Sequence, residues 1–317
     1  MIEVPAEARD RAGRHLRVVA VVVSYNRRDL VLETLGAVLA QDPAPGRVVL
    51  VENASTDGTA AAVREAYPGV DLLELARNTG GAGGFALGVA AGLRRRADVL
   101  WLLDDDAVPE PGALAALLGS YEAYGGPVPP AAVASKAVWV DGRIHRMNVP
   151  RRRRGATPAQ VRLARDVGCT PMRTASFCSL LVDGEVARRE ALPIADYFLW
   201  NDDFEYTARI LRGRVGLYCP ASVVVHKTAT YYNSGSAPGD RFFYDVRNMA
   251  WMLLRSRGLA PPERAFFTIV ALRRWVRTVY RSHERRPLVR DLGRGLVAAV
   301  ARPPRPTRDV LGDVWSA

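Results

Sequence analysis

An apolar run that ends in three consecutive acids constrains this chain more than any other stretch. Residues 99–103 are wholly apolar, and Asp104, Asp105 and Asp106 follow them directly. Because such a run is typical of a buried parallel strand, we expect its carboxyl end to deliver the acids to the edge of a sheet. Adjacent carboxylates repel one another unless a cation lies among them, and hard oxygen ligands favour Mg²⁺ or Mn²⁺. The sequence therefore predicts a divalent-metal site.

The residues before this run alternate between apolar segments and segments with helical periodicity. Strands are expected at residues 18–23, 48–51, 70–75 and 99–103, with polar residues after each and helices between them. Four strand-helix repeats predict an α/β fold with a doubly wound, mostly parallel sheet. The polar strand ends are then expected to meet at one edge of that sheet.

A glycine-rich stretch, Asn78 to Gly84, comes just before the helix that leads into the acidic run. We expect a loop here, in which the amides near Gly80 approach an anionic group. The stretch has no Walker lysine and lacks the first-turn position of a dinucleotide fingerprint. Because the acids lie immediately downstream, nucleotide contact is favoured over a plain turn.

The middle of the chain predicts shorter elements. We expect a helix over residues 113–124, a hairpin about Asp141 and Gly142, a mobile loop at 151–154 and strands at 176–182 and 222–225. The last of these strands stops at His226, which from the residues alone is as well explained by a core position as by a ligand.

A second acidic cluster, Asp202 and Asp203, opens a predicted helix among aromatic residues. Acids at a helix start commonly stabilise the helix dipole and do nothing more. A carboxylate beside apolar surface tends to have a raised pKa and can serve as a general base. We assign one of the two acids to capping and the other to chemistry.

The basic charge is confined to the end of the chain. The net charge is +11, and residues 241–317 hold 16 Arg against 6 Asp or Glu. A basic nucleic-acid-binding protein is an alternative, but this excess lies in a tail without a recognised nucleic-acid module. Three cysteines without CxxC spacing favour reduced thiols and a cytosolic setting. We expect neither a secretory signal nor a membrane-spanning helix.

The motifs together resemble those of a known family. They are Val-Val-Ser-Tyr-Asn-Arg (22–27), Glu-Asn-Ala-Ser-Thr-Asp-Gly-Thr (52–59), Arg-Asn-Thr-Gly-Gly-Ala-Gly-Gly-Phe (77–85), the acids at 104–106 and Trp-Asn-Asp-Asp-Phe-Glu-Tyr (200–206). This order resembles family 2 glycosyltransferases of the GT-A fold, and most of all the galactofuranosyl and rhamnosyl transferases of bacterial cell-wall polysaccharide. A sugar-1-phosphate nucleotidyltransferase would instead want glycines and basic residues right after the first strand.

The resemblance implies a role for each matched position. Asp104, Asp106 and His226 would hold Mn²⁺ or Mg²⁺ on the donor diphosphate, and Asp203 would be the catalytic base of an inverting transfer. The nucleotide would lie along the following residues: Tyr25, Asn53, Asn78 and Gly80, with Asp105 near the ribose. Residues 241–248 resemble a segment of the galactofuranosyl and rhamnosyl members. UDP-galactofuranose is therefore expected as donor before dTDP-rhamnose, and a polyprenyl-diphosphate-linked or other cell-wall glycan as acceptor.

Three regions follow from these patterns: an N-terminal extension (1–16), a GT-A catalytic domain (17–240) and a basic helical C-terminal region (241–317). Residues 263–286 interleave apolar side chains with arginines. Such a helix is suited to lie on an anionic membrane surface, here the inner face of the plasma membrane. The alternative is that its apolar face packs on the catalytic domain. The expected location is therefore cytoplasmic and peripheral.

Overall fold

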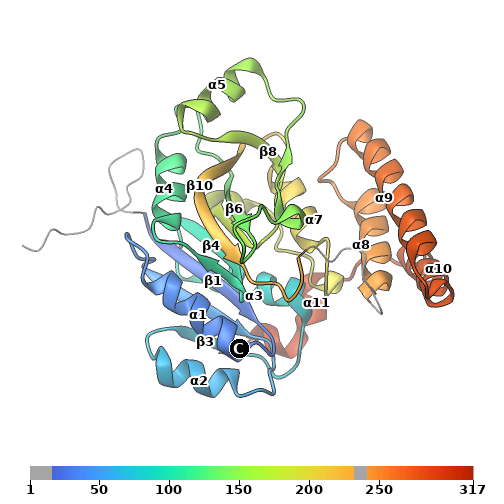
Figure 1. Ribbon diagram of the computed structural model, residues 1–317, viewed down its shortest axis with the longest axis horizontal. Coiled ribbons are helices and arrows are strands. Elements are labelled where there is room, and N and C mark those ends of the chain that lie inside the picture. Colours follow the sequence, from blue (N-terminus) through green and yellow to red (C-terminus); the bar gives the residue numbers. More distant parts are fainter. Residues whose placement is uncertain (1–15, 232–240, 317) are drawn as a thin grey trace, which may run out of the picture.

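The computed structural model describes residues 16–231 and 241–316 of the chain. A ten-stranded sheet forms the centre of this part of the chain (Figure 1). In sheet order the strands are β3 (Asp71–Glu74), β2 (Arg47–Glu52), β1 (Val18–Ser24), β4 (Val99–Asp104), β9 (Ser179–Asp183), β6 (Ala132–Val138), β10 (Gly216–His226), β8 (Thr170–Thr174) and β7 (Arg151–Arg152), and β5 (Ala107–Pro109) pairs with β10. The predicted α/β fold is confirmed. Most of the expected N-terminal extension lies outside the described residues.

The strands β1 to β4 pair in parallel, as predicted, and their carboxyl ends share one edge. Ser24 lies opposite Glu52 in the β1–β2 pair, and Val23 lies opposite Asp104 in the β1–β4 pair. β1 alternates between two apolar clusters, so it is buried on both faces. This double burial explains its continuous apolar sequence.

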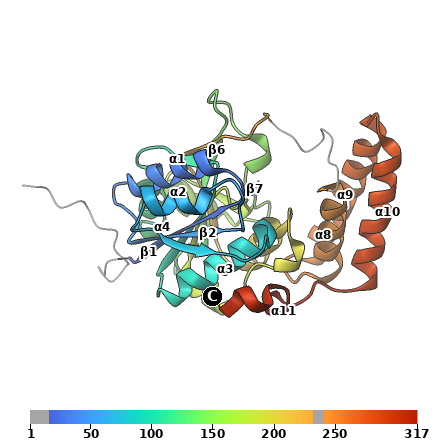
Figure 2. The ribbon, with the colours of Figure 1, turned by 90° about the horizontal axis from the view of Figure 1, so that it is seen from below.

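Helices cover both faces of the sheet (Figure 2). One face carries α1 (Arg28–Leu39), α2 (Thr59–Ala66) and α4 (Ala113–Glu122), and the other carries α3 (Gly80–Arg94), α7 (Asp202–Ile210) and α11 (Thr307–Leu311). Two further helices, α5 (Pro158–Asp166) and α6 (Gly184–Arg189), lie between the later strands in the chain. The arrangement is the doubly wound sandwich expected for alternating strands and helices.

The glycine-rich stretch is not the predicted loop, because α3 begins at Gly80. The reason is close packing of this helix on the sheet. Gly84, Gly88 and Gly92 recur every four residues and so share one face of α3. A Cβ at Gly84 would collide with Val23, and the other two meet side chains of β1 and β4 in the same way. The glycines therefore let the helix backbone approach the strands closely.

Two expectations for the middle of the chain were also wrong. The turn at Asp141 and Gly142 forms, but after a single bridge between Val138 and Ile144 the chain enters a 3₁₀ turn (Arg146–Asn148) in place of a second strand. The segment expected as a mobile loop starts with β7, which pairs with β8. Stacking of Arg151 on aromatic rings gives the segment a tertiary anchor that local sequence does not reveal.

The last quarter of the described chain is helical, as predicted. It contains α8 (Arg241–Arg255), α9 (Pro261–Arg281) and α10 (Arg285–Ala301), which stand beside the sheet, before α11 returns beneath α3 (Figures 1 and 2). The predicted boundary at residue 240 falls outside the described residues. α9 is tied to the catalytic part by the Arg173–Glu263 ion pair at 2.6 Å and by edge-to-face packing of Phe204 on Phe267. At the end of the chain, the guanidinium of Arg77 donates to the Val310 carbonyl.

Candidate active site

The acidic triplet lies where the sequence predicts it, at the carboxyl end of β4. Asp104 is the last residue of the strand, and Asp105 and Asp106 form the turn into β5 with side chains that are almost fully buried. The Tyr25 amide donates to Asp105 Oδ2 at 3.2 Å, and the Thr34 hydroxyl donates to the Asp105 carbonyl at 2.8 Å. The loop after β1 and the helix α1 therefore together fix the turn that carries the acids.

His226 meets the triplet because β5 pairs with the end of β10. Ala107 lies opposite His226, and the Lys227 amide donates to the Asp106 carbonyl at 2.8 Å. His226 Nε2 is then 3.0 Å from Asp106 Oδ1, while Nδ1 is 2.9 Å from Asn148 Oδ1. A second partner on the far ring nitrogen fixes the orientation of an imidazole, as is common for metal-binding histidines.

Cys178 joins this cluster, although the sequence analysis assigned no ligand role to any of the three cysteines. One ligand atom each from Asp104, Cys178 and His226 lie within 4.8 Å of one another. Cys178 precedes β9, and Leu103 pairs with Ser179, so the antiparallel pairing of β9 with β4 brings the thiol to the acids. Oxygen, nitrogen and sulfur donors at this spacing can together hold a divalent cation.

The carboxylates of the triplet differ in their affinity for protons. Burial, with Asp106 nearby, raises the pKa of Asp104 to about 7, and burial raises that of Asp105 to about 6. Burial opposes ionisation of Asp106 too, but its hydrogen bond to His226 and the charges of His226 and Arg27 lower its pKa to about 2. Burial also disfavours the charged imidazole, yet Cys178 and Asp106 raise the pKa of His226. Without a cation the site thus keeps an Asp106–His226 ion pair.

Arg27 is a member of the site that was not predicted. Its guanidinium forms an ion pair with Asp106 and lies 3.5 Å from Asp105, and its side chain is partly exposed. The charge of Arg27 thus neutralises acids that would otherwise repel one another. A signal was present, because Arg27 follows β1 and therefore lies at the same sheet edge as the triplet.

The residues expected along the nucleotide fall into two groups. The Tyr25 side chain is exposed at the edge, whereas Asn53 is buried and accepts hydrogen bonds from the amide and hydroxyl of Thr79 at 2.7 and 3.0 Å. The Asn53 amide also donates to the Gly80 carbonyl at 2.9 Å, and Asn78 Oδ1 accepts from the Gly80 amide at 2.7 Å. Asn53 and Asn78 thus shape the first turn of α3.

Asp202 and Asp203 open α7 as predicted, and both have raised pKa values. Burial is the main cause for each; it raises the pKa of Asp203 to about 6, with a further rise from the charge of Asp104 and an opposing effect of Arg151. Asp203 Oδ1 accepts a hydrogen bond from the Phe204 amide at 2.6 Å. The charge interaction with Asp104 links α7 to the triplet at the edge of the sheet.

The comparison with known families identifies the family of this chain. A family model described as glycosyl transferase family 2 matches residues 19–180, which include β1 to β4 and the acidic triplet. The chain belongs to this family. It is therefore a glycosyltransferase. The family match ends at residue 180, before α7, and so does not include Asp202 and Asp203.

Curated relatives match a shorter part of this family 2 glycosyltransferase. Galactofuranosyltransferase GlfT1 of Mycolicibacterium smegmatis is 43% identical over 100 residues, which are 30% of this chain and 32% of the relative. The protein of the same name from Mycobacterium tuberculosis H37Rv is 40% identical over 113 residues, 34% of this chain and 36% of the relative. The matched segment thus spans about a third of the length of these relatives.

Solved structures confirm the GT-A fold over most of the chain. The mannosyltransferase PcManGT from Pyrobaculum calidifontis, in complex with GDP-Man and Mn²⁺, has a TM-score of 0.54 and 20% identity to this chain. The match covers 98% of this chain and 82% of the PcManGT chain. The structure of S. aureus TarS 1-349 in complex with UDP-GlcNAc has a TM-score of 0.57 and 13% identity. The match covers 90% of this chain and 82% of that fragment. At these identities the likeness concerns the fold.

Proposed function

We propose that this glycosyltransferase moves a sugar from a nucleotide-sugar donor with inversion, and that Asp203 is its catalytic base. The proposal rests on the position of Asp203, which is half-buried at the start of α7, where the charge of Asp104 from the acid-histidine cluster contributes to its raised pKa. A base with a pKa near 6 is mostly ionised at neutral pH and is still basic enough to take a proton.

Direct displacement at the anomeric carbon needs three functions from this site. Asp203 takes the proton of the acceptor hydroxyl as that oxygen attacks, and the bond to the donor diphosphate breaks on the opposite side of the ring. Asp104, Asp106 and His226 would hold Mn²⁺ or Mg²⁺, which when bound supplies Lewis-acid stabilisation of the departing diphosphate. Tyr25 and Asp105 would border the nucleotide. Asp202 remains the second candidate for the base.

For the donor we infer UDP-galactofuranose, with dTDP-rhamnose as the second candidate. Support comes from the curated relatives, which are named galactofuranosyltransferases, although the match spans a third of their length. The acceptor in this proposal is a polyprenyl-diphosphate-linked or other cell-wall glycan.

A panel of nucleotide sugars tests the donor. Purified protein with Mn²⁺ and a synthetic polyprenyl-linked acceptor should release UDP from UDP-galactofuranose, and release should increase with acceptor concentration. Asp106→Ala protein is the control for contaminating hydrolases. Release of dTDP from dTDP-rhamnose alone would replace the donor, and absence of acceptor-dependent release from every nucleotide sugar would overturn the proposal.

We also infer that the C-terminal helices bind the anionic inner face of the plasma membrane. α9 buries one face through Phe267, Ala271 and Trp275. Its opposite face exposes a stripe of apolar residues next to arginines: Ile269, Leu272, Val276 and Tyr280, beside Arg273, Arg277 and Arg281. An apolar stripe bordered by cations fits the interface of an anionic bilayer. No helix among the described residues is both long and apolar enough to cross a membrane.

A further inference from the structure

The segment that leads into α7 has a strained backbone. Phe198, Trp200 and Asn201 have φ values of 60°, 67° and 64°, and none of them is glycine. The Leu199 amide donates to the Tyr197 carbonyl at 2.6 Å, which closes a γ-turn about Phe198. Residues in such conformations cost about 1–3 kcal/mol each and persist only where surrounding contacts hold them. Asp202 and Asp203 follow this segment directly.

The contact that holds the segment comes from α8. The buried side-chain amide of Asn248 lies 2.9 Å from the Tyr197 carbonyl oxygen and 2.8 Å from those of Leu199 and Trp200. The two hydrogens of one NH₂ group are thus shared among three carbonyls of a single turn.

Arg247 fixes which way this amide points. Its guanidinium donates through Nε and Nη2 to Asn248 Oδ1, at 3.0 and 2.9 Å, so the NH₂ group must face the segment. Arg247 Nη2 also donates to the carbonyls of Asp196 and Tyr197 at 2.7 and 3.1 Å. The buried guanidinium stacks on the Trp251 ring, with its carbon 4.3 Å from the ring centroid. The pair forms a clamp, which we call the 247–248 clamp.

The same segment reaches the donor side of the sheet. The Phe198 carbonyl accepts a hydrogen bond from the Ala82 amide at 3.2 Å, and a Cβ at Gly80 would collide with that carbonyl. The Gly80 carbonyl in turn accepts a hydrogen bond from the side-chain amide of Asn53. The 247–248 clamp therefore acts on a turn that contacts both the start of α3 and the start of α7.

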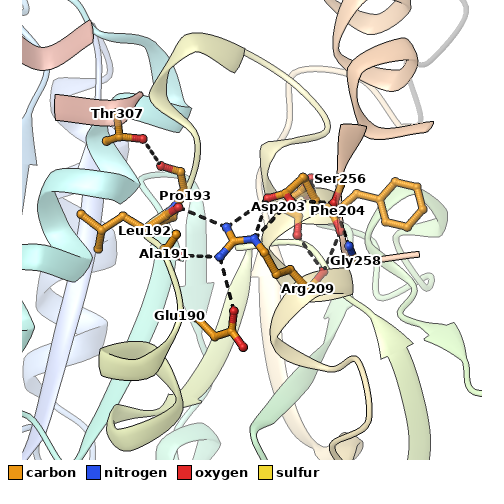
Figure 3. A network of polar contacts seen from close by, with 12 residues as sticks. Glu190, Ala191, Leu192, Pro193, Asp203, Phe204, Arg209, Ser256, Gly258 and Thr307 are labelled. Atoms are coloured by element: carbon orange, nitrogen blue, oxygen red, sulfur yellow. Dashed lines mark hydrogen bonds and ion pairs between the residues drawn. The ribbon is translucent and has the colours of Figure 1, made fainter. Parts of the chain in front are cut away.

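The helix α7 has other anchors besides the clamp. Just before it, the Asn201 side-chain amide donates to Asp245 Oδ1 of α8 at 3.2 Å. Arg209 near its carboxyl end contacts Glu190 and the carbonyls of Ala191 and Leu192 (Figure 3). The Ser256 hydroxyl donates to Glu205 at 2.8 Å. These contacts hold the body of α7, so loss of the clamp should release the preceding turn while the helix stays in place.

We propose that Asn248, oriented by Arg247, is a positioning residue that holds residues 197–201 in the conformation that presents Asp203 to the acceptor hydroxyl. This inference rests on the proposed role of Asp203. It also makes the C-terminal helices part of the catalytic apparatus, in addition to any role at a membrane.

Two variants of Asn248 test the inference. Asn248→Asp keeps the size of the side chain and the acceptor for Arg247, but it turns an oxygen toward three carbonyls. Asn248→Ala removes the amide. Leu288→Ala is the matched control, because Leu288 is buried in α10 within the apolar cluster that packs α8 and does not bond the segment. Its loss lowers stability by packing alone.

Hydrogen exchange and kinetics are measured on all three full-length variants. In the Asn248 variants we expect faster amide exchange in residues 196–203 and unchanged exchange in β1 to β4. We also expect kcat to fall about 10- to 100-fold through misplacement of the base, with the donor KM within about threefold of wild type. The control should keep wild-type exchange in residues 196–203 and wild-type kcat.

The outcomes separate this inference from the proposed function. Unchanged exchange in residues 196–203, or a kcat within twofold of wild type, would overturn the positioning role. Faster exchange in a protein that transfers no sugar from any donor would retain the clamp and reject the proposed function. Equal kcat losses in the control and in the Asn248 variants would reduce Asn248 to a stabilising residue of α8.

Discussion

Replacement of Asp203 by asparagine should abolish sugar transfer and at the same time stabilise the fold. Asn keeps the size of the side chain and an Oδ1 that can accept from the Phe204 amide. It can neither ionise nor take a proton at neutral pH. Loss of a general base lowers kcat about 10²- to 10⁴-fold, and donor binding should persist because the proposed metal-binding residues are intact.

The expected gain in stability follows from the pKa of Asp203. Burial raises that pKa from 3.8 to about 6, a difference that corresponds to about 3 kcal/mol of disfavoured ionisation in the folded state. Protonation of Asp203 thus favours the folded state. This contribution to the free energy of unfolding is fully present below about pH 4 and is lost as the pH rises through about 6. The variant has no such loss, and its advantage should grow from near zero at pH 4 to its full value at pH 8.

Urea unfolding of metal-free protein at pH 4.5 and pH 8, followed by circular dichroism, measures the difference in the free energy of unfolding. Transfer assays on the wild type should show kcat/KM falling about tenfold per pH unit below pH 6, as expected for a base that must be ionised. Equal stability differences at both pH values, or transfer by Asp203→Asn within a few fold of wild type, would refute the reasoning. Loss of transfer in Asp202→Asn alone would move the base to Asp202.

Three further predictions concern other parts of the molecule. Chelation should stop turnover, and Asp106→Ala should weaken UDP binding in Mn²⁺ but not in metal-free buffer, as measured by calorimetry; full activity in excess EDTA would remove the metal from the proposal. Asn53→Ala should lower the free energy of unfolding by about 1–3 kcal/mol, because buried donors on Thr79 lose their acceptor; urea titration measures this, and an unchanged midpoint would contradict it. Ile269→Glu with Val276→Glu should reduce co-sedimentation with anionic liposomes while kcat on a soluble acceptor persists; wild-type sedimentation would contradict the membrane role.

The features that could be predicted from the sequence are those encoded by neighbouring residues. An apolar run that turns acidic specifies both a buried strand and its polar end, so β4 and the triplet were located correctly. Asp203 was likewise placed at the start of α7, because acids that precede a helical pattern mark its beginning. These local signals suffice for the family and for the edge of the sheet that bears the site.

The rest depends on pairing between distant strands. Cys178 reaches Asp104 only because β9 runs antiparallel beside β4, and His226 reaches Asp106 only because β5 turns back onto β10. Neither pairing leaves a local pattern in the chain. The glycines of α3 were misread for a related reason, since the close approach of a helix to a sheet and the freedom of a loop both select glycine.

The docking of α11 has a consequence for synthesis of the protein. Arg77 and the Val310 carbonyl that it binds are 233 residues apart in the chain, and Leu311 belongs to the same apolar cluster as Phe85. A nascent chain that has already formed β1 to β4 therefore leaves part of its α3 layer uncovered until α11 emerges from the ribosome. Contacts at such separation form late, and the uncovered apolar surface is open to aggregation or to chaperones meanwhile. A chain cut just before α11 would keep every candidate catalytic residue and still lack the helix that covers part of the α3 layer.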